Sequence, residues 1–556
     1  MVKVILEYAF RKSFAIVLIL AVSWSDASLK AQVGQTSYNF FYRVCFRDKG
    51  EYTARDFRAE DLLSPRAIER RNRAGIQTPH LTDLPVWQSY LTEISSLGYT
   101  LHSVSKWMNC ALYKTTGPMD TEILLSLPYV TGVAIVKNIS TKNGYSDKLD
   151  FFYRQAELPP YDNPVRMLGG NYLHTSGFDG TGILIAVLDG GFRNAENIPA
   201  LESLRRRKGI KGTYDFVLNT ESVYGHHHHG TAVLSVLAGD LPNLIKGSAT
   251  GAQYLLLRTE DDNTEYPVEE DHWVAGAEYA DSSGADIITS SLGYSTFDDP
   301  DMNYKYSDMN GNSTFVTKAA DIAASKGILV VNSAGNERDN DWSYIIAPAD
   351  GDSVLAVGAV DAGRVISSFS SAGPSADNRV KPDVAAQGVD VPVQFDINTV
   401  ARANGTSFSC PVISGMCACL MQAAPYTLNH EILNAVLASS DRFSQPDSLY
   451  GYGIPDIAKA ITILQNKYLP ANSDSPSVGP NPFEDHLNII FRENPERLRV
   501  EIFNLSGKLM LIKEFDSFTG RYLRLYEPGR LQKGLYIIRM STEKEVYKLK
   551  ILKVSN

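Results

Sequence analysis

Three side chains in this sequence have the chemistry needed for serine-based nucleophilic catalysis: the carboxylate of Asp189, the imidazole of His229 and the hydroxyl of Ser407. A serine hydroxyl is a weak nucleophile on its own, and it attacks a carbonyl carbon only when a neighbouring base takes its proton. An imidazole can be that base near neutral pH, and a carboxylate can hold the imidazole in the required tautomer. The three residues lie far apart in the sequence, so this chemistry requires a fold that brings them together.

The sequence around each residue indicates how a fold would place it. Asp189 ends the apolar run 183–188 and is followed by two glycines. His229 opens one helical stretch, and Ser407 lies near the start of another. Functional groups of open α/β sheets gather at the carboxyl ends of the strands. We therefore expect the aspartate at the strand end and the two side chains at helix starts to converge.

Apolar runs and helical stretches alternate around these residues. Buried strands that alternate with helices predict a parallel sheet with helices on both faces, which is an α/β fold. We expect this α/β domain to occupy residues 165–468. The predicted strands are residues 183–188, 254–257, 286–288 and 328–331, and the predicted helices include residues 231–237, 272–282 and 317–326.

Two smaller units flank the predicted α/β domain. Residues 38–140 mix strand-like and helical stretches, which predicts a small α+β unit. The polar residues 137–164 are interpreted as a linker, and so are residues 469–482, which are rich in Pro, Ser, Asn and Gly. Residues 483–556 contain short strand-like stretches separated by turn residues, which predicts a C-terminal β-sandwich.

The first residues of the sequence have the pattern of an export signal. Lys3, Arg11 and Lys12 precede an apolar stretch at residues 13–24, and small residues follow. Because this stretch is too short to span a bilayer, we expect a signal peptide at residues 1–31 and an exported protein. An anchor that is never cut is the alternative. The net charge of −10 argues against a nucleic-acid partner, since binding a phosphate backbone takes a basic surface.

The five cysteines are too few for a disulfide framework in a chain of 556 residues. Cys45 and Cys110 lie in separate strand-like stretches and could pair. Cys410, Cys417 and Cys419 follow Ser407 closely and are interpreted as small buried apolar groups.

Two clusters raise the question of a metal ion. Four consecutive histidines end at His229, but four neighbours in sequence cannot all face one ion. We expect the first three, His226, His227 and His228, to form a solvated loop. Acidic and amide residues between positions 298 and 312 carry the oxygen ligands that suit calcium, although a solvated loop is the simpler interpretation. No metal ligand is assigned, and calcium binding stays open.

Three segments of the sequence resemble the subtilisin family of serine proteases, and they occur in that family's order. The similarity covers residues 169–468. The sequence departs from the usual pattern of the family at Ala232 and Cys410, and neither departure removes a catalytic group. The three segments are residues 185–191, 229–233 and 405–411.

This resemblance implies a subtilisin-like parallel sheet and a secreted serine endopeptidase made as a zymogen. Asp189, His229 and Ser407 would be its catalytic triad, and it would hydrolyse protein or peptide substrates through an acyl-enzyme intermediate. The resemblance implies that no cofactor is required.

Two further segments are similar to substrate-binding segments of the same family. Residues 331–337 resemble the segment that carries the oxyanion-hole asparagine, here Asn336. Ile346 falls at the floor of the primary specificity pocket, where a bulky side chain predicts a preference for small or medium residues before the cut bond. The residues implied to bind substrate are Ser291, Leu292, Gly293, Ser333, Ala334 and Gly335.

The flanking units have resemblances of their own. The N-terminal unit is similar in place and size to a subtilase propeptide, which implies that it inhibits the enzyme until it is removed. Residues 479–556 resemble the C-terminal sorting domain of Bacteroidetes-type (type IX) secretion, which implies an export machinery as partner and a secreted or cell-surface location. Two alternatives remain: a degenerate protease homologue that serves as an adhesin, and a sedolisin-like acid peptidase with a Ser-Glu-Asp site.

Overall fold

The computed structural model describes residues 39–139, 148–149, 151–155 and 164–467, and residues 475–554 with gaps at 480, 485, 494, 517, 519–520 and 526. Internal contacts divide the chain into a short first part, Met1–Ser37, and a second part, Tyr38–Asn556. All described residues belong to the second part, which contains the three domains described below. The predicted signal peptide at residues 1–31 lies outside the described residues, as does much of both predicted linkers.

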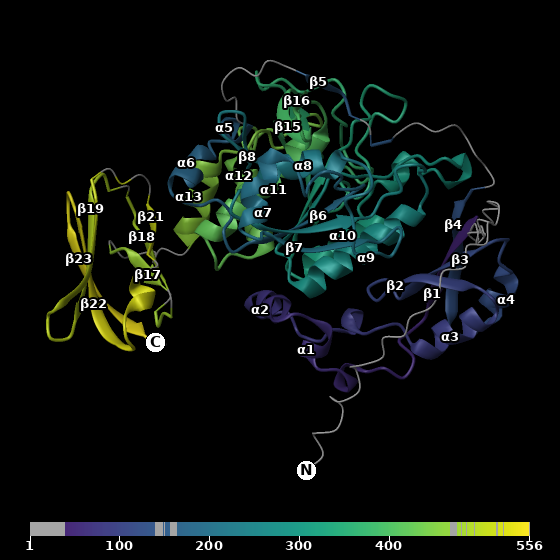
Figure 1. Ribbon diagram of the computed structural model, residues 1–556, viewed down its shortest axis with the longest axis horizontal. Coiled ribbons are helices and arrows are strands. Elements are labelled where there is room, and N and C mark those ends of the chain that lie inside the picture. Colours follow the sequence, from purple (N-terminus) through teal and green to yellow (C-terminus); the bar gives the residue numbers. More distant parts are fainter. Residues whose placement is uncertain are drawn as a thin grey trace, which may run out of the picture. The chain divides into compact units, whose positions relative to one another are not determined.

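A seven-stranded parallel sheet forms the centre of the largest domain (Figure 1). Its strand order is β14-β13-β12-β11-β6-β10-β7, so β6 lies between β11 and β10. The predicted α/β fold with a parallel sheet is confirmed. The strands are β6 Leu184–Asp189, β7 Ile210–Asp215, β10 Gln253–Arg258, β11 Ile287–Ser290, β12 Leu329–Ser333, β13 Val354–Val360 and β14 Val384–Gln387.

Helices cover both faces of this sheet, which is why its strands are apolar without alternation. Ile185 and Val187 of β6 belong to the core beneath α8, α11, α12 and α13, whereas Ala186 and Leu188 belong to the core beneath α9 and α10. Figure 1 shows these two groups of helices on opposite sides of the strands. The helices are α8 His229–Ala238, α9 Val268–Ser283, α10 Phe315–Ser325, α11 Thr406–Ala423, α12 Asn429–Ser439 and α13 Ile457–Lys467.

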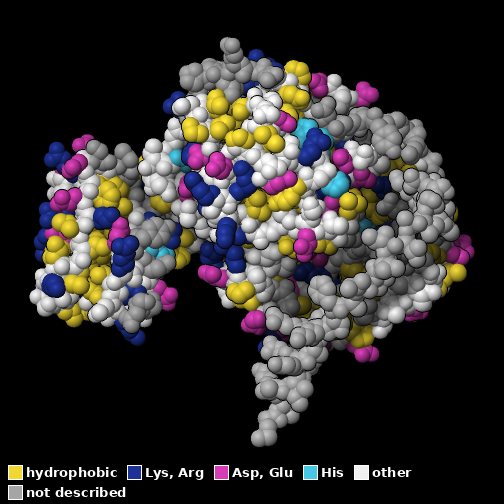
Figure 2. Space-filling model, in the orientation of Figure 1, with side chains coloured by type: hydrophobic (Ala, Val, Ile, Leu, Met, Phe, Trp, Pro, Cys, Tyr) yellow, Lys and Arg dark blue, Asp and Glu magenta, His cyan; other side chains and the backbone are white. Residues whose placement is uncertain are grey.

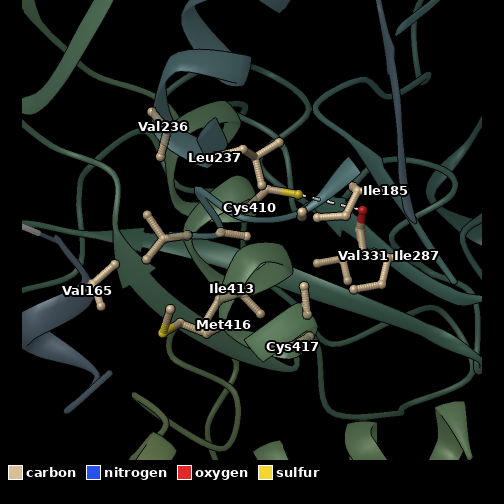
Figure 3. Close-up of a cluster of buried hydrophobic side chains, with 14 of the residues drawn as sticks. Val165, Ile185, Val236, Leu237, Ile287, Val331, Cys410, Ile413, Met416 and Cys417 are labelled. Atoms are coloured by element: carbon tan, nitrogen blue, oxygen red, sulfur yellow. Dashed lines mark hydrogen bonds between the residues drawn. The ribbon is translucent and has the colours of Figure 1, made fainter. Parts of the chain in front are cut away.

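The helix α11 passes through the middle of one core. It has the length and hydropathy of a membrane span, but 94% of its 18 residues are buried in the domain. In Figure 3 its residues Cys410, Ile413 and Cys417 lie among apolar side chains of the sheet such as Ile185 and Val331. The three cysteines of this helix are buried thiols, as the sequence predicts.

The N-terminal α+β unit has a four-stranded antiparallel sheet in the order β2-β3-β1-β4 and an apolar core of its own. Cys45 of β1 lies opposite Cys110 of β3, and a disulfide joins them, so the pairing left open by the sequence is confirmed. Its elements are β1 Phe40–Phe46, α1 Ala59–Leu62, α2 Pro65–Arg73, α3 Gln88–Ser96, β2 Thr100–Ser105, β3 Cys110–Thr115, α4 Thr121–Ser126 and β4 Val130–Asn138.

The C-terminal unit consists of two antiparallel sheets around a separate apolar core, which confirms the predicted strand-rich domain. One sheet has the order β17-β18-β21 and the other the order β20-β19-β22-β23. The strands are β17 Ser477–Gly479, β18 Leu487–Ile490, β19 Leu498–Asn504, β20 Leu509–Phe515, β21 Tyr522–Leu525, β22 Gly534–Thr542 and β23 Val546–Lys553.

Candidate active site

Asp189 and His229 meet at the carboxyl end of β6. The Nδ1 atom of His229 lies 2.8 Å from Oδ1 and 3.0 Å from Oδ2 of Asp189. Both side chains are buried, and the backbone N–H of Gly190 donates a further hydrogen bond to the carboxylate at 2.8 Å. A carboxylate that accepts the Nδ1–H leaves Nε2 of the imidazole as the proton acceptor.

Glycines allow the first turn of α8 to approach β6 this closely. A Cβ atom on Gly230 would lie 2.9 Å from the Cβ of Asp189. Gly191 has φ 150°, and a Cβ there would lie 2.7 Å from backbone atoms of His227. Side chains at either position would separate the imidazole from the carboxylate.

Ser407 is the second residue of α11 and is tied to the end of β11. Its hydroxyl donates to the carbonyl oxygen of Ser291 at 3.4 Å, and the Ser291 hydroxyl donates to the carbonyl oxygen of Ser407 at 3.0 Å. The Ser407 side chain is 8% exposed, which leaves a narrow opening to solvent. In this state the Ser407 hydroxyl donates to a backbone oxygen, Ser291 O, rather than to a side chain.

Asn336 follows β12 and lies beside the residue that precedes Ser407. Its Oδ1 accepts hydrogen bonds from the backbone N–H and the hydroxyl of Thr406, both at 2.9 Å. With Oδ1 occupied in this way, the two N–H groups on Nδ2 are the donors that Asn336 can offer to a substrate.

The predicted substrate-binding residues lie on two neighbouring segments, Ser291–Gly293 after β11 and Ser333–Gly335 at the end of β12. The Nδ2 of Asn332 joins the segments by donating to the carbonyl oxygen of Leu292 at 2.9 Å. The side chain of Ile346 fills the space between them. A Cβ on Gly293 would overlap this side chain, and a Cβ on Gly335 would lie 3.0 Å from it.

The predicted solvated histidine loop is wrong for His227. This residue is 6% exposed, and its Nδ1 accepts a hydrogen bond from the backbone N–H of His229 at 3.1 Å. The Nε2 of His226 lies 3.4 Å from the buried carboxylate of Asp215. The loop packs against the rest of the domain through the carboxylate of Asp215 and through its close approach to Gly191. Both partners are distant in sequence, so no local pattern encodes either contact.

Three acidic residues between positions 298 and 308 accept hydrogen bonds from backbone N–H groups, and for Asp299 and Asp308 the donor lies two or three residues away. Asp298 accepts from the N–H of Glu265, and Asp308 accepts from the N–H of Lys305. Among the described residues, the three carboxylates that lie close enough together to share one cation are Glu260, Glu265 and Glu269, within 4.8 Å of one another.

This three-carboxylate cluster was missed by the sequence analysis, although residues 259–271 are rich in Asp and Glu. Burial raises the pKa of Glu265 to about 7, and it raises the pKa of Glu269 well above the ordinary value. The ammonium group of Lys148 lies within 2.8 Å of all three carboxylates.

Part of the predicted linker at residues 137–164 crosses the site. The ring of Phe151 lies edge-on to the rings of His229 and Phe408, with centroids 5.7 Å and 5.1 Å away. The carbonyl oxygen of Phe152 accepts a hydrogen bond from the N–H of Asn404 at 3.0 Å. The next residues form the strand β5, Tyr153–Gln155, which pairs with β16, Thr399–Ala403. The linker interpretation is therefore wrong for these residues.

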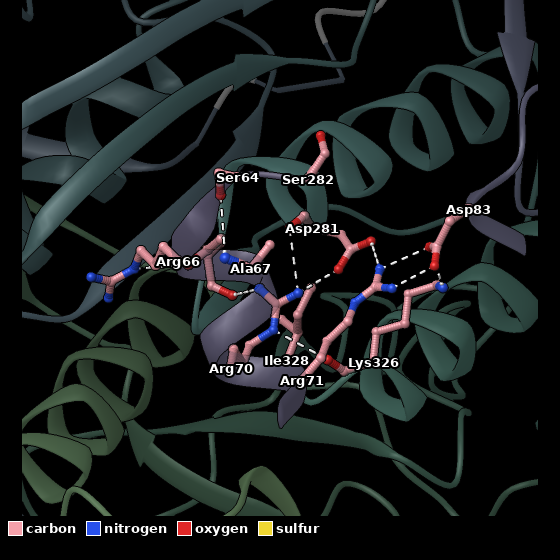
Figure 4. Close-up of polar contacts among 12 residues, drawn as sticks. Ser64, Arg66, Ala67, Arg70, Arg71, Asp83, Asp281, Ser282, Lys326 and Ile328 are labelled. Carbon is pink, nitrogen blue, oxygen red and sulfur yellow. Dashed lines mark hydrogen bonds and ion pairs between the residues drawn. The ribbon is translucent and has the colours of Figure 1, made fainter. Parts of the chain in front are cut away.

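The N-terminal unit contacts α9 through buried ion pairs (Figure 4). The guanidinium of Arg71 binds both carboxylate oxygens of Asp83 at 2.6 and 2.9 Å, and it also binds Asp281 of α9 at 2.5 Å. Arg70 binds the other oxygen of Asp281, and the ammonium of Lys326 lies 2.9 Å from Asp83. The side chains of Arg71, Asp83 and Asp281 are fully buried, so each charge depends on its partners.

Positive and negative side chains are mixed on the face of the described surface that Figure 2 shows. Figure 2 shows Lys and Arg side chains interspersed with Asp and Glu across that face.

A parallel α/β sheet that holds an Asp–His pair and a helix-borne serine, in the chain order Asp, His, Ser, is the architecture of one class of serine peptidases. Residues 180–453 match the model of the subtilase family, Peptidase S8, and the chain belongs to this family. Residues 41–149 match the Peptidase S8 propeptide domain of Bacteroidota, and residues 477–554 match the secretion system C-terminal sorting domain. The sorting domain indicates export to the cell surface or beyond.

Curated relatives lead to the same family. The chain is 32% identical to the thermophilic serine proteinase of Bacillus sp. strain AK1, over 50% of this chain and 61% of that protein. It is 29% identical to the subtilisin-like protease SBT6.1 of Arabidopsis thaliana, over 56% of this chain and 29% of that protein. It is 26% identical to subtilisin E of Bacillus subtilis, over 66% of this chain and 84% of that protein. The chain thus spans less than two thirds of the first two relatives.

Proposed function

We propose that this chain is the zymogen of an exported serine endopeptidase in which Asp189, His229 and Ser407 form the catalytic triad. The observation that carries the proposal is the buried hydrogen bond between Asp189 and Nδ1 of His229 at 2.8 Å, at the strand end that faces the start of α11. This bond leaves Nε2 as the base that a serine nucleophile needs.

In the proposed reaction, Ser407 attacks the carbonyl carbon of the scissile peptide bond while Nε2 of His229 takes its proton. The imidazolium is stabilised by Asp189 and then gives its proton to the leaving amine, which departs and leaves an acyl-enzyme. Water attacks the acyl-enzyme by the same route. Nδ2 of Asn336 and the backbone N–H of Ser407 would stabilise the oxyanion in both steps.

Substrate peptide would bind in extended form along the segments Ser291–Gly293 and Ser333–Gly335. These segments leave the carboxyl ends of neighbouring strands, β11 and β12. Their backbone groups can add a substrate as a further strand, which suits recognition of peptides with little sequence constraint.

We propose a role for each part of the chain, from the N-terminus to the C-terminus. We assign residues 1–31 to a signal peptide, 38–140 to an inhibitory propeptide, 165–468 to the catalytic domain, 469–482 to a linker and 483–556 to the sorting domain. The proposed reaction uses protein groups alone. A calcium ion would have a structural role, and thermal unfolding of the zymogen with and without calcium measures it.

Labelling with a serine-directed fluorophosphonate tests the proposed function, because only an activated serine reacts. The processed protein should be labelled, and Ser407→Ala should abolish the label. Ser409→Ala is the matched control, since this serine lies two residues further along the same helix and donates to the Thr406 carbonyl oxygen. An adhesin-like homologue would take no label. An acid peptidase would cleave peptides best below about pH 5 and keep its activity in His229→Ala.

A further inference from the structure

The described residues 148–149 and 151–152 lie where a peptide about to be cut would lie, if the proposed function holds. A Cβ on Gly190, next to Asp189, would overlap the side chain of Leu149. Two residues further on, the ring of Phe151 lies against the imidazole of His229. The backbone of Phe152 then pairs with Asn404, three residues before Ser407. The contacts of the described residues 149, 151 and 152 therefore extend from Gly190, next to Asp189, to Asn404, near Ser407.

The side chain of Lys148, at the start of this course, enters the three-carboxylate cluster. Its ammonium lies 2.8 Å from Glu260, 2.8 Å from Glu265 and 2.6 Å from Glu269. An ammonium group has three N–H donors, so each carboxylate can take one. Burial alone would lower the pKa of Lys148, but the three carboxylates outweigh burial and the pKa lies well above its ordinary value.

The carboxylates of Glu260 and Glu269 accept hydrogen bonds from groups of the catalytic domain. The hydroxyl of Tyr294 donates to Glu260 at 2.5 Å. The backbone N–H groups of Asp261 and Tyr266 donate to Glu269 at 2.9 and 3.2 Å. Two of the three carboxylates are therefore held by the catalytic domain itself, and within the described part of the chain the cation of the cluster is Lys148.

Lys148 lies in the match to the propeptide family, whereas the three glutamates lie in the match to the subtilase family. The match to the propeptide family ends at residue 149. Removal of the propeptide takes the ammonium away and leaves three neighbouring carboxylates, two of which are almost fully buried while Lys148 is in place. Buried charges without a partner are strongly unfavourable, so the vacated cluster is an acceptor for another cation.

We infer that Glu260, Glu265 and Glu269 form a subsite that recognises a Lys or Arg side chain of the substrate, and that Lys148 is its first occupant. The recognised residue lies three positions before the residue that contacts His229. In the chain's own maturation that contacting residue is Phe151, which becomes the first residue of the mature enzyme.

A basic side chain suits this cluster better than a metal ion does. Calcium takes six to eight oxygen ligands, and the structure brings three carboxylates together here. The aliphatic stem of Lys or Arg can reach the cluster from the peptide course, as that of Lys148 does. A metal ion in the mature enzyme is the competing outcome of the experiment.

Matched peptides test the subsite directly. Internally quenched peptides with the sequence of residues 144–155 would carry Lys, Arg, norleucine or Glu at the position of Lys148, and the processed enzyme would cleave each one. The kcat/KM values for Lys and Arg should exceed that for norleucine by roughly 10- to 100-fold, as expected for a buried charge-assisted hydrogen bond. The Glu peptide should be cleaved most slowly.

Variants of the cluster show whether the preference comes from it. Glu265→Gln, at the most exposed of the three glutamates, and Glu260→Gln should bring the Lys-to-norleucine ratio close to one. Glu202→Gln, at an exposed glutamate of α7, Glu202–Arg206, is the matched control and should leave the ratio unchanged.

The outcomes separate this inference from the proposed function. Equal cleavage of the Lys and norleucine peptides would overturn the subsite and leave the peptidase intact. Absence of both peptide cleavage and phosphonate labelling would overturn both. If calcium raised the unfolding temperature of the mature enzyme but not of Glu265→Gln, and also removed the Lys preference, the cluster would be a metal site instead.

The chain's own maturation provides a second readout. Lys148→Met should slow the appearance of mature enzyme, Lys148→Arg should restore it, and Lys211→Met, at an exposed lysine of β7, should have no effect. N-terminal sequencing should find Phe151 first. A mature N-terminus other than Phe151, or equal maturation rates for the Met and Arg variants at position 148, would contradict the inference.

Discussion

The ring of Phe151 stands edge-on to the imidazole of His229, with the ring centroids 5.7 Å apart and the planes 68° from parallel. The chain's own segment thus covers the proposed general base before maturation. Phe151→Ala in a Ser407→Ala zymogen should therefore speed deuterium exchange at the imidazole C2 position of His229, measured by mass spectrometry. Phe152→Ala is the control, since that side chain is 69% exposed, and equal rates in both variants would show that Phe151 does not shield the imidazole.

The proposed triad and oxyanion donor predict graded losses of activity. Asp189→Asn should lower kcat by about 10⁴, because the amide favours the wrong imidazole tautomer. Asn336→Ala should lower kcat on the order of 10² to 10³ with little change in KM, because the lost donor serves the transition state. Steady-state kinetics of both variants on one peptide measures these effects. If Asn336→Ala changed KM and left kcat unaltered, Asn336 would not be an oxyanion-hole donor.

Ile346 gives a prediction about the residue before the cut bond. Its side chain is 7% exposed and occupies the space between Gly293 and Gly335, so little volume remains for a large substrate side chain. Peptides with Ala before the cut should be cleaved faster than matched peptides with Phe. Ile346→Gly should reverse the order. Faster cleavage after Phe by the unaltered enzyme would show that the pocket opens elsewhere.

Acid should loosen the attachment of the propeptide. His102 of β2 faces His272 of α9, with ring centroids 5.5 Å apart, and burial lowers the pKa of His102 to about 4 and that of His272 well below its ordinary value. Detached histidines titrate near 6.5. The neutral pair therefore favours attachment above about pH 6.5, and this contribution is lost as the pH falls from there towards 4.

Hydrogen exchange of β2 in the Ser407→Ala zymogen measures this effect. Exchange should be faster at pH 5 than at pH 7, after correction for the intrinsic rates, and His102→Gln combined with His272→Gln should reduce the difference. The charged groups that act on the pair are Lys114, Lys137 and Arg258, which oppose protonation, and Asp215 and Asp261, which favour it. An unchanged pH dependence in the double variant would assign the effect to other groups, such as Glu270, whose pKa burial raises to about 7.

The buried ion pairs between the propeptide and α9 predict a large effect of one substitution. Arg71→Ala leaves Asp83 and Asp281 buried with one cation fewer, and breaking a buried pair in this way costs about 3–5 kcal/mol. Thermal unfolding of the Ser407→Ala zymogen should show a marked loss of stability. Arg58→Ala removes the exposed pair with Asp61 and should change little, so similar losses in both variants would contradict the role of burial.

Local sequence patterns identified the elements that carry the proposed triad. The apolar run before Asp189 became β6, and the helical stretch at His229 became α8, because periodicity and burial act within a few residues. The burial of His227, the three-carboxylate cluster and the course of Phe151 over His229 could not be predicted in this way. Each depends on segments far apart in the sequence, such as the pairing of β5 with β16.

The one disulfide of the described chain lies in the propeptide, between Cys45 and Cys110, whereas the cysteines of the catalytic domain are buried thiols. Burial raises the pKa of the Cys410 thiol to about 11, which keeps it protonated and unreactive. The disulfide, which forms only in an oxidising compartment, therefore belongs to the propeptide and not to the catalytic domain. In the described chain, a reducing environment could therefore break a disulfide of the precursor but none of the catalytic domain.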